Sequence, residues 1–316
     1  MSQCGRNPSD WRKIMKEIPE NPVVAVLGGA GEMGRKAVSI VSGFEGISEL
    51  IVADFDLAAA EKIVARNTAE AKIPLTAAQV DVTDAKQLAE LLDGVDVVLN
   101  MTGPFYRLGV SVLQAALSAG CHYLDICDDW EPTVNMLALH EEAVESDVVA
   151  VIGIGASPGI SNILARVVCD RLDRVDDLYT VWPVDAGDER GDAIQVAVEE
   201  NQGASAAIVH WMQQISGEIE VVKEGQLVAQ RPMLPVTLNY PNVGEGTGYT
   251  VGHPEPITLV ETMGIRGSSA SLMLLRKSTA AFIDGLRKRI DAGQLSLEAG
   301  AKEIGKPSRL GRLKAA

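Results

Sequence analysis

The sequence predicts an α/β protein: a doubly wound parallel sheet, followed by a second α+β domain with a mixed or antiparallel sheet. From residue 23 to residue 153, short apolar runs alternate with helix-like segments, and this alternation is typical of parallel strands joined by right-handed crossovers. A glycine-rich turn follows the first run directly. After residue 159, β-branched extended segments joined by Gly, Pro and Asp turns indicate the second sheet.

The first domain is expected over 23–160, after an N-terminal arm at 1–22 in which 9–17 forms a short capped helix. Helices such as 57–67 and 84–92 are expected between strands, the latter capped by Thr83 or Asp84. The predicted strand order is 3-2-1-4-5-6. Strands are expected at 23–27, 50–53, 78–82, 95–99, 122–126 and 148–153.

The second domain is expected over 161–270, beginning with a helix at 161–172, and Lys223 to Gln226 is predicted to be a hairpin turn. Residues 271–316 are expected to form C-terminal helices and a basic tail. The helix at 271–292 would carry Leu272, Leu275 and Phe282 on one apolar face and leave Arg287, Lys288 and Arg289 outside. Extended segments are expected at 178–184, 193–198, 218–222 and 236–240, with a helix at 204–215 among them.

The segment Gly29-Ala30-Gly31-Glu32-Met33-Gly34 has the G-x-G-x-x-G spacing. In this motif the first glycine permits a tight turn, the second lets a pyrophosphate approach the backbone, and the third lets the helix pack against the strand. Asp54 ends the next predicted strand, where a carboxylate binds the adenosine ribose hydroxyls. These seven residues are therefore predicted to bind a dinucleotide. Asp54 favours NAD over NADP, because it would repel a 2′-phosphate and Phe55 supplies no compensating charge.

Ligands bind at the carboxyl ends of the strands in an open parallel sheet, so the turns there supply further candidates. Asp81 and Val82, after strand three, are expected to flank the adenine. The turns after strands four, five and six should converge on the nicotinamide end. The turn after strand four supplies the remaining predicted cofactor contacts, Thr102, Gly103 and Pro104.

Tyr106, Asp125 and His253 are the candidate catalytic residues. Asp125 is either a structural cap at its strand end or a group that positions an ammonium group or a proton. His253 titrates near neutral pH and is a candidate proton donor, with a structural role as the alternative. Arg107 is a candidate anchor for a substrate carboxylate, with a plain surface role as the alternative, and the same holds for Arg231 and Arg266.

The composition excludes several classes of function. The formal charge of −15 and the pI near 4.7 argue against nucleic-acid binding. The four cysteines show no C-x-x-C pair, so we expect neither a metal site nor a disulfide framework. No Ser-His-Asp pattern indicates hydrolysis. Without an export signal or an apolar stretch long enough for a membrane span, the protein is expected in the cytoplasm.

Three segments together resemble the saccharopine dehydrogenase family, which includes saccharopine reductases, lysine 6-dehydrogenases and carboxyspermidine-type dehydrogenases. They are 103–109, 119–125 and 157–165, and 252–259 is similar to a segment of family members with unassigned substrates. The resemblance implies NAD(P)-dependent hydride transfer at a C–N or C=N carbon of an amino acid or polyamine-like amine. It makes Arg107, Ser157 and Asn162 candidate substrate-binding residues.

Ser157 stands where saccharopine reductases tend to carry an acid and lysine dehydrogenases a small residue, so the sequence is closer to the lysine dehydrogenase branch. A closing segment usual in the family is not found after Leu313, and we expect a homodimer in which the sheets of the second domain meet. Two alternatives stay open. The first is a dinucleotide-binding sensor or subunit without turnover. The second is an auxiliary enoyl reductase of the same broad family.

Overall fold

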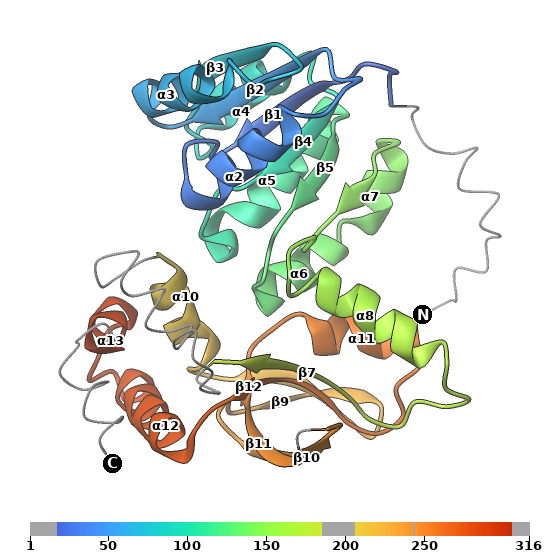
Figure 1. Ribbon diagram of the computed structural model, residues 1–316, viewed down its shortest axis with the longest axis vertical. Coiled ribbons are helices and arrows are strands. Elements are labelled where there is room, and N and C mark those ends of the chain that lie inside the picture. Colours follow the sequence, from blue (N-terminus) through green and yellow to red (C-terminus); the bar gives the residue numbers. More distant parts are fainter. Residues whose placement is uncertain (1–17, 185–205, 243, 305–316) are drawn as a thin grey trace. The chain divides into compact units, whose positions relative to one another are not determined.

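The computed structural model describes residues 18–184, 206–242 and 244–304 (Figure 1). The chain divides into two compact units, 1–155 and 156–316. Within the described residues, no helix is both long and apolar enough to cross a membrane. The predicted helix at 9–17, the extended segment at 193–198 and the basic tail from 305 lie outside the described residues.

The first unit is built on a six-stranded sheet in the order β3-β2-β1-β4-β5-β6, and every pair in it is parallel. The predicted doubly wound order is therefore confirmed. The strands are β1 (Val23–Leu27), β2 (Glu49–Asp54), β3 (Leu75–Gln79), β4 (Val97–Asn100), β5 (His122–Asp125) and β6 (Ala150–Val151). Strand β3 lies three residues before the predicted 78–82.

Helices cover both faces of this sheet, because successive strand residues point to opposite sides. The helices are α2 (Glu32–Val41), α3 (Leu57–Asn67), α4 (Ala85–Leu92), α5 (Phe105–Ala119), α6 (Trp130–Leu137) and α7 (His140–Glu145). On one face Val24 and Val26 pack with α2 and α3. On the other, Ala25 and Leu27 pack with α4, α5 and α6.

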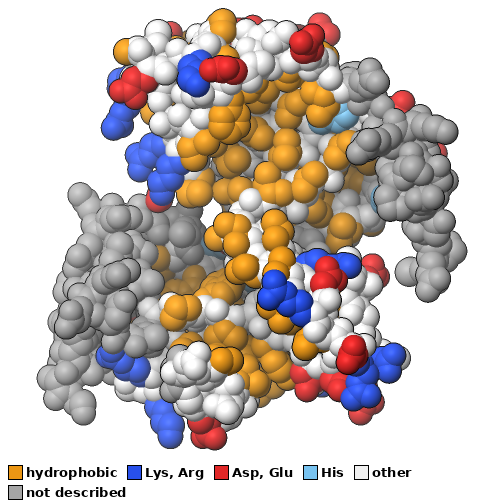
Figure 2. Space-filling model, turned by 45° about the vertical axis from the view of Figure 1, so that its right-hand side comes forward, with side chains coloured by type: hydrophobic (Ala, Val, Ile, Leu, Met, Phe, Trp, Pro, Cys, Tyr) orange, Lys and Arg blue, Asp and Glu red, His pale blue; other side chains and the backbone are white. Residues whose placement is uncertain are grey.

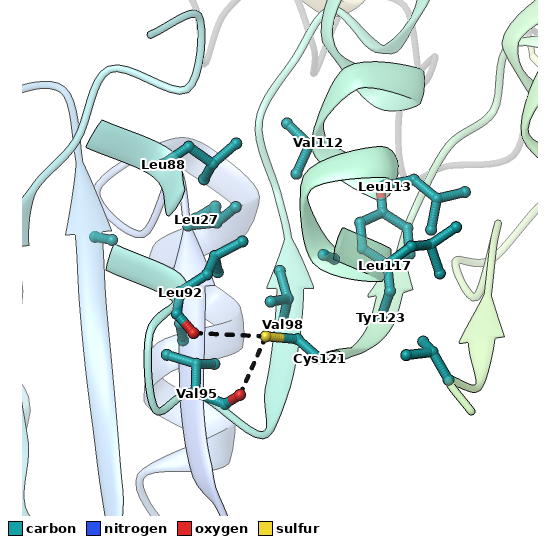
Figure 3. Close-up of a cluster of buried hydrophobic side chains, with 14 of the residues drawn as sticks. Leu27, Leu88, Leu92, Val95, Val98, Val112, Leu113, Leu117, Cys121 and Tyr123 are labelled. Atoms are coloured by element: carbon teal, nitrogen blue, oxygen red, sulfur yellow. Dashed lines mark hydrogen bonds between the residues drawn. The ribbon is translucent and has the colours of Figure 1, made fainter. Parts of the chain in front are cut away.

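Figure 3 shows part of the second of these cores, where Leu27, Val98 and Tyr123 lie among the leucines of α4 and α5. The Cys121 thiol, just before β5, donates to the carbonyl oxygens of Val95 at 3.1 Å and Leu92 at 3.7 Å. None of the three described cysteines forms a disulfide. The Cys121 thiol therefore ties the loop between α4 and β4 to the start of β5.

The second unit contains one six-stranded sheet in the order β10-β11-β12-β8-β9, with β7 also paired to β12. Among the strand pairs of the described residues, only β7–β12 is parallel, so the predicted mixed sheet is confirmed. The predicted hairpin turn joins β8 to β9, with Lys223 opposite Gln226. The strands are β7 (Leu178–Pro183), β8 (Ile219–Lys223), β9 (Gln226–Gln230), β10 (Pro235–Tyr240), β11 (Gly244–Val251) and β12 (Ser269–Leu274).

Helices α10 (Ala206–Gln214), α12 (Lys277–Asp291) and α13 (Leu297–Ile304) pack around Met273 of β12. Helices α8 (Ile160–Cys169) and α11 (Glu255–Met263) pack together around Ala165 and Leu259. The outer side of α8 is apolar and more than 45% exposed at Ile160, Ile163, Leu164, Val167 and Val168. Hydrophobic side chains are visible at the surface of both units in Figure 2.

The predicted helix at 271–292 is wrong at its start. Residues 269–274 form β12, and the helix begins only at Lys277. Leu272 is fully buried in this strand, where it packs with Ile219 and Val221 of β8. Arg287 was expected on the outside of that helix but is 7% exposed. It lies 2.7 Å from both Asp284 and Asp291, which compensate the buried charge.

Candidate functional site

The turn between β1 and α2 brings backbone atoms closer than a side chain would allow. A Cβ at Gly34 would lie 2.0 Å from the carbonyl oxygen of Gly28, and one at Gly29 would lie 2.7 Å from Val52. Gly28 has a φ of 71°, which disfavours any other residue there. Gly31 is the N-cap of α2 and makes no side-chain hydrogen bond. No side chain therefore competes for the first N–H groups of the helix, and the turn fits a pyrophosphate.

Asp54 lies against this turn. Its Oδ2 accepts a hydrogen bond from the Ala30 N–H at 2.9 Å, and its Oδ1 accepts one from the Asp56 N–H at 3.1 Å. The carboxylate is thereby fixed beside the glycine motif while the residue stays partly exposed. Phe55, which follows it, is 71% exposed. The fold thus brings together the glycine motif and the acid that the sequence singled out.

The other predicted cofactor residues also lie in turns at the carboxyl ends of strands. Asp81 Oδ1 accepts hydrogen bonds from the backbone N–H and the hydroxyl of Thr83, at 2.9 and 2.6 Å. Asp81 and Val82 are both partly exposed. The Thr102 N–H donates to Asn100 Oδ1 at 3.0 Å. Gly103 and Pro104, joined by a cis peptide bond, complete the turn into α5.

A buried chain of polar groups links the ends of β4, β5 and β6. Asn100 Nδ2 donates to the Tyr123 hydroxyl at 2.9 Å, and that hydroxyl donates to Asp125 Oδ2 at 2.9 Å. Asp125 Oδ1 accepts from the backbone N–H groups of Cys127 and Gly153, at 3.0 and 2.7 Å. Asp125 has no exposed surface. Its Oδ1 thus links the turn after β5 to the turn after β6, while its Oδ2 is bound to Tyr123.

Burial has the largest effect on the pKa values of the titratable groups in this polar cluster. It raises the pKa of Asp125 above its usual value, although the N–H groups of Gly153 and Cys127 act in the opposite direction. Burial, followed by the charge of Asp125, also raises the pKa of the Tyr123 hydroxyl and of the Cys127 thiol. The Tyr123 and Cys127 side chains therefore stay protonated and available as donors at neutral pH.

Tyr106 and Arg107 lie in the first turn of α5, directly after the Gly103–Pro104 turn. Tyr106 is 43% exposed, and Arg107 is exposed. Arg231 and Arg266, in the second unit, are exposed as well. Arg231 lies 3.9 Å from Asp284, which already supplies it with a carboxylate.

The remaining three candidates, Ser157, Asn162 and His253, meet in the second unit around Glu255, at the start of α11. Glu255 Oε1 accepts hydrogen bonds from the hydroxyls of Ser157 and, at 2.9 Å, Ser161. Its Oε2 is hydrogen-bonded to His253 Nδ1. Asn162 Nδ2 donates to Thr258 Oγ1 at 2.9 Å.

The sequence interpretation missed Glu255, although it lies in the quoted segment 252–259. It is fully buried, and so is His253, at 1% exposure. An acid two residues after a histidine, at the first position of a helix, is the signal that was available. Nothing in the sequence joins them to Ser157, because that hydroxyl is 98 residues away.

Comparison with known proteins finds a family model that matches most of the first unit. Residues 24–151 match the family model of the saccharopine dehydrogenase NADP binding domain. The apo structure of saccharopine dehydrogenase (L-Glu forming) from Saccharomyces cerevisiae is similar, with a TM-score of 0.58 and 17% identity. That likeness covers 84% of this chain but 57% of the yeast enzyme, so this chain spans little more than half the length of that protein.

Weaker likenesses extend to two further solved structures. GenD2 from gentamicin A biosynthesis, in complex with NAD, shares 15% identity at a TM-score of 0.38, over 82% of this chain and 67% of its own. Shikimate 5-dehydrogenase from Listeria monocytogenes shares 18% identity at a TM-score of 0.32, over 45% of this chain and 47% of its own.

Proposed function

Because residues 24–151 of this chain belong to the saccharopine dehydrogenase NADP-binding domain family, we propose that the protein is an NAD(P)-dependent oxidoreductase. Its substrate would be an amino acid or polyamine-like amine, in which a C–N bond is oxidised to C=N or the reverse. The observation that carries this proposal is the glycine turn, where a Cβ at Gly34 would overlap the Gly28 carbonyl oxygen. This close packing of helix and turn is the role of the third glycine of the motif, and the second, Gly31, leaves the backbone open to a pyrophosphate.

Residues of the first unit are assigned to three parts of the dinucleotide. The first N–H groups of α2 would bind the pyrophosphate, and Asp54 would bind the ribose hydroxyls. Asp81 and Val82 would flank the adenine. When bound, the nicotinamide supplies the hydride acceptor or donor. We favour NAD over NADP, although the matching family is named for NADP, because Asp54 is an acid and would repel a 2′-phosphate.

The candidate catalytic residues take different roles in this proposal. Tyr106, at the start of α5, is 43% exposed and is the better candidate for contact with substrate. Both oxygens of Asp125 are engaged by neighbouring groups, so we assign it to holding the turns after β5 and β6. Arg107 is assigned to a substrate carboxylate, since guanidinium and carboxylate pair through two hydrogen bonds.

The test is a fluorescence titration of the purified protein with NADH and NADPH, followed by a screen of amino acids, polyamines and 2-oxo acids with ammonia. Turnover is read at the absorbance band of the reduced nicotinamide. Cofactor-dependent turnover of an amine supports the proposal. Cofactor binding without turnover supports the sensor or subunit alternative instead, and no binding of either cofactor refutes both.

A further inference from the structure

The hydrogen bonds around Glu255 show that a charged carboxylate is buried in the second unit. The residue has no exposed surface, and Ser271 adds a fourth donor, at 3.4 Å from Oε2, to those of Ser157, Ser161 and His253. Burial by itself raises the pKa of Glu255, but the hydrogen bond and charge of His253 and the Ser157 hydroxyl outweigh it, so the pKa lies below its usual value. Glu255 is therefore ionised at neutral pH.

A nearby positive charge stabilises a buried carboxylate, because removing an ion from water costs several kcal/mol. Among the described residues, His253 is the ion-pair partner of Glu255, and neither lysine nor arginine takes that role. A protonated His253 would balance the charge of Glu255. In that form both ring nitrogens carry a hydrogen, and Nε2 is a donor as well as Nδ1.

Two N–H donors of this cluster lack acceptors. His253 Nε2 and Trp182 Nε1 are buried atoms without hydrogen-bond partners in the described part of the chain. Their rings are in edge-to-face contact, with centroids 4.2 Å apart and an angle of 82° between the planes. An indole nitrogen is only a donor, so the missing partner of Trp182 is an acceptor. Since buried polar groups are nearly always paired, two neighbouring donors without acceptors indicate a ligand.

We propose that His253 and Trp182 form a binding site for a carboxylate group, in which the two N–H groups donate to the carboxylate and Glu255 positions the imidazolium from behind. An ammonium group does not fit, because it offers only donors to a site that already has donors. A carboxylate supplies an acceptor for each N–H and pairs with the imidazolium. Ser157, Ser161 and Ser271 contribute indirectly by holding Glu255.

This inference deepens the proposed function, and it rests on that function only in naming the carboxylate as part of the substrate. Among the substrates proposed above, it selects those with a carboxylate, namely amino acids and carboxylated polyamines, over polyamines without one. In a zwitterionic amino acid, the ammonium group would also balance the negative charge of the carboxylate. Trp182 and His253 are then specificity-determining residues for the carboxylate.

The experiment uses the full chain without cofactor, so that it does not depend on turnover. Acetate is titrated into 15N-labelled protein at constant pH and ionic strength, and the indole N–H signals of the four tryptophans are followed by NMR. Ethylammonium, a cation of similar size, is the matched probe. The variant Trp182→Phe assigns the signal and keeps the ring. If it does not fold, the same substitution at Trp11, Trp130 and Trp211 assigns it by elimination.

We expect acetate to shift the Trp182 signal in a saturable way and ethylammonium to leave it unchanged. Trp182→Phe should weaken acetate binding about tenfold to a hundredfold, the effect of one hydrogen bond to a charged group. Trp211→Phe is the control and should bind acetate normally, because the Trp211 Nε1–H already donates to Met273 Sδ at 2.9 Å. The side-chain nitrogens of His253 should both be protonated at neutral pH.

Three results would overturn the inference: no saturable shift with acetate, a shift with ethylammonium instead, or a neutral His253 imidazole. Failure of the proposed function is distinguishable from these. If the protein binds acetate but oxidises no amine, the carboxylate site is supported and the oxidoreductase function is refuted. If it oxidises an amine but does not bind acetate, the oxidoreductase function is supported and the carboxylate site is refuted.

Discussion

Replacing Gly34 by alanine tests whether the turn between β1 and α2 is built for close approach. The added Cβ would lie 2.0 Å from the Gly28 carbonyl oxygen and 2.8 Å from both the Gly28 carbonyl carbon and the Gly29 Cα. The first distance is about 1.4 Å shorter than the 3.4 Å at which ordinary contact begins. All three atoms belong to the backbone, so the helix or the turn itself has to move.

The magnitude follows from two opposing effects. Alanine in place of glycine inside a helix stabilises by about 1 kcal/mol, whereas overpacking costs about 1–3 kcal/mol. Because the overlapped atoms are backbone, we expect the upper end of that cost and a net loss of about 2 kcal/mol. Gly109 in α5 is the matched control, since its Cβ would meet only side-chain atoms at 3.4–3.6 Å. Gly109→Ala should be neutral or stabilising by up to about 1 kcal/mol.

The assay is urea unfolding of the wild type and both variants, with and without NADH. Two units need not unfold together, and the transition that the cofactor shifts to higher urea identifies the unit that binds it. Displacing the turn should also weaken NADH binding about tenfold or more, because N–H groups that bind the phosphates lose their alignment.

A Gly34→Ala variant as stable as Gly109→Ala, with NADH affinity equal to the wild type, would refute this reasoning. It would show that the turn accommodates a methyl group and that the closeness of Gly34 to Gly28 has no part in binding. A loss of stability with unchanged affinity would separate packing from binding and remove the turn from the cofactor site.

Three further predictions follow. Asp54→Ala should weaken NADH binding but not NADPH binding, since only NADH keeps the ribose 2′-hydroxyl that the carboxylate binds; in the wild type, NADPH binding about tenfold tighter than NADH would show the assignment to be wrong. Because the pKa of Asp125 is raised in the folded protein, its protonated carboxyl group adds to the free energy of unfolding. This contribution is complete below the usual pKa of aspartate and is lost as pH rises through the raised value. Urea unfolding across that range should show this decline in the wild type and not in Asp125→Asn, and identical pH profiles would contradict it. We expect a homodimer through the sheets of the second unit, with Leu272 inside the unit and not at the contact; light scattering that gives 33.6 kDa, the mass of one chain, would exclude it.

The sequence by itself determined the features that depend on residues close together in the chain. Alternating apolar runs and helical segments were enough for the strand order of the first unit, and the glycine spacing with Asp54 was enough for the dinucleotide turn. Lys223 to Gln226 was recognisable as a hairpin because its turn residues lie next to each other in the chain. In each case, neighbouring residues carry the steric or hydrophobic requirement.

Only the tertiary structure decided the rest. The run Ser269–Leu274 is compatible with either a helix or a strand, as short apolar runs are, and it is a strand because β11 and β7 satisfy its backbone on both sides. Asp125 is engaged by the Gly153 N–H, 28 residues away in the chain. Glu255 accepts hydrogen bonds from hydroxyl groups in the turn before α8, in α8 and in β12. Such contacts are set by folding of the whole unit, because a buried charge takes its partners from whichever elements the packing brings beside it.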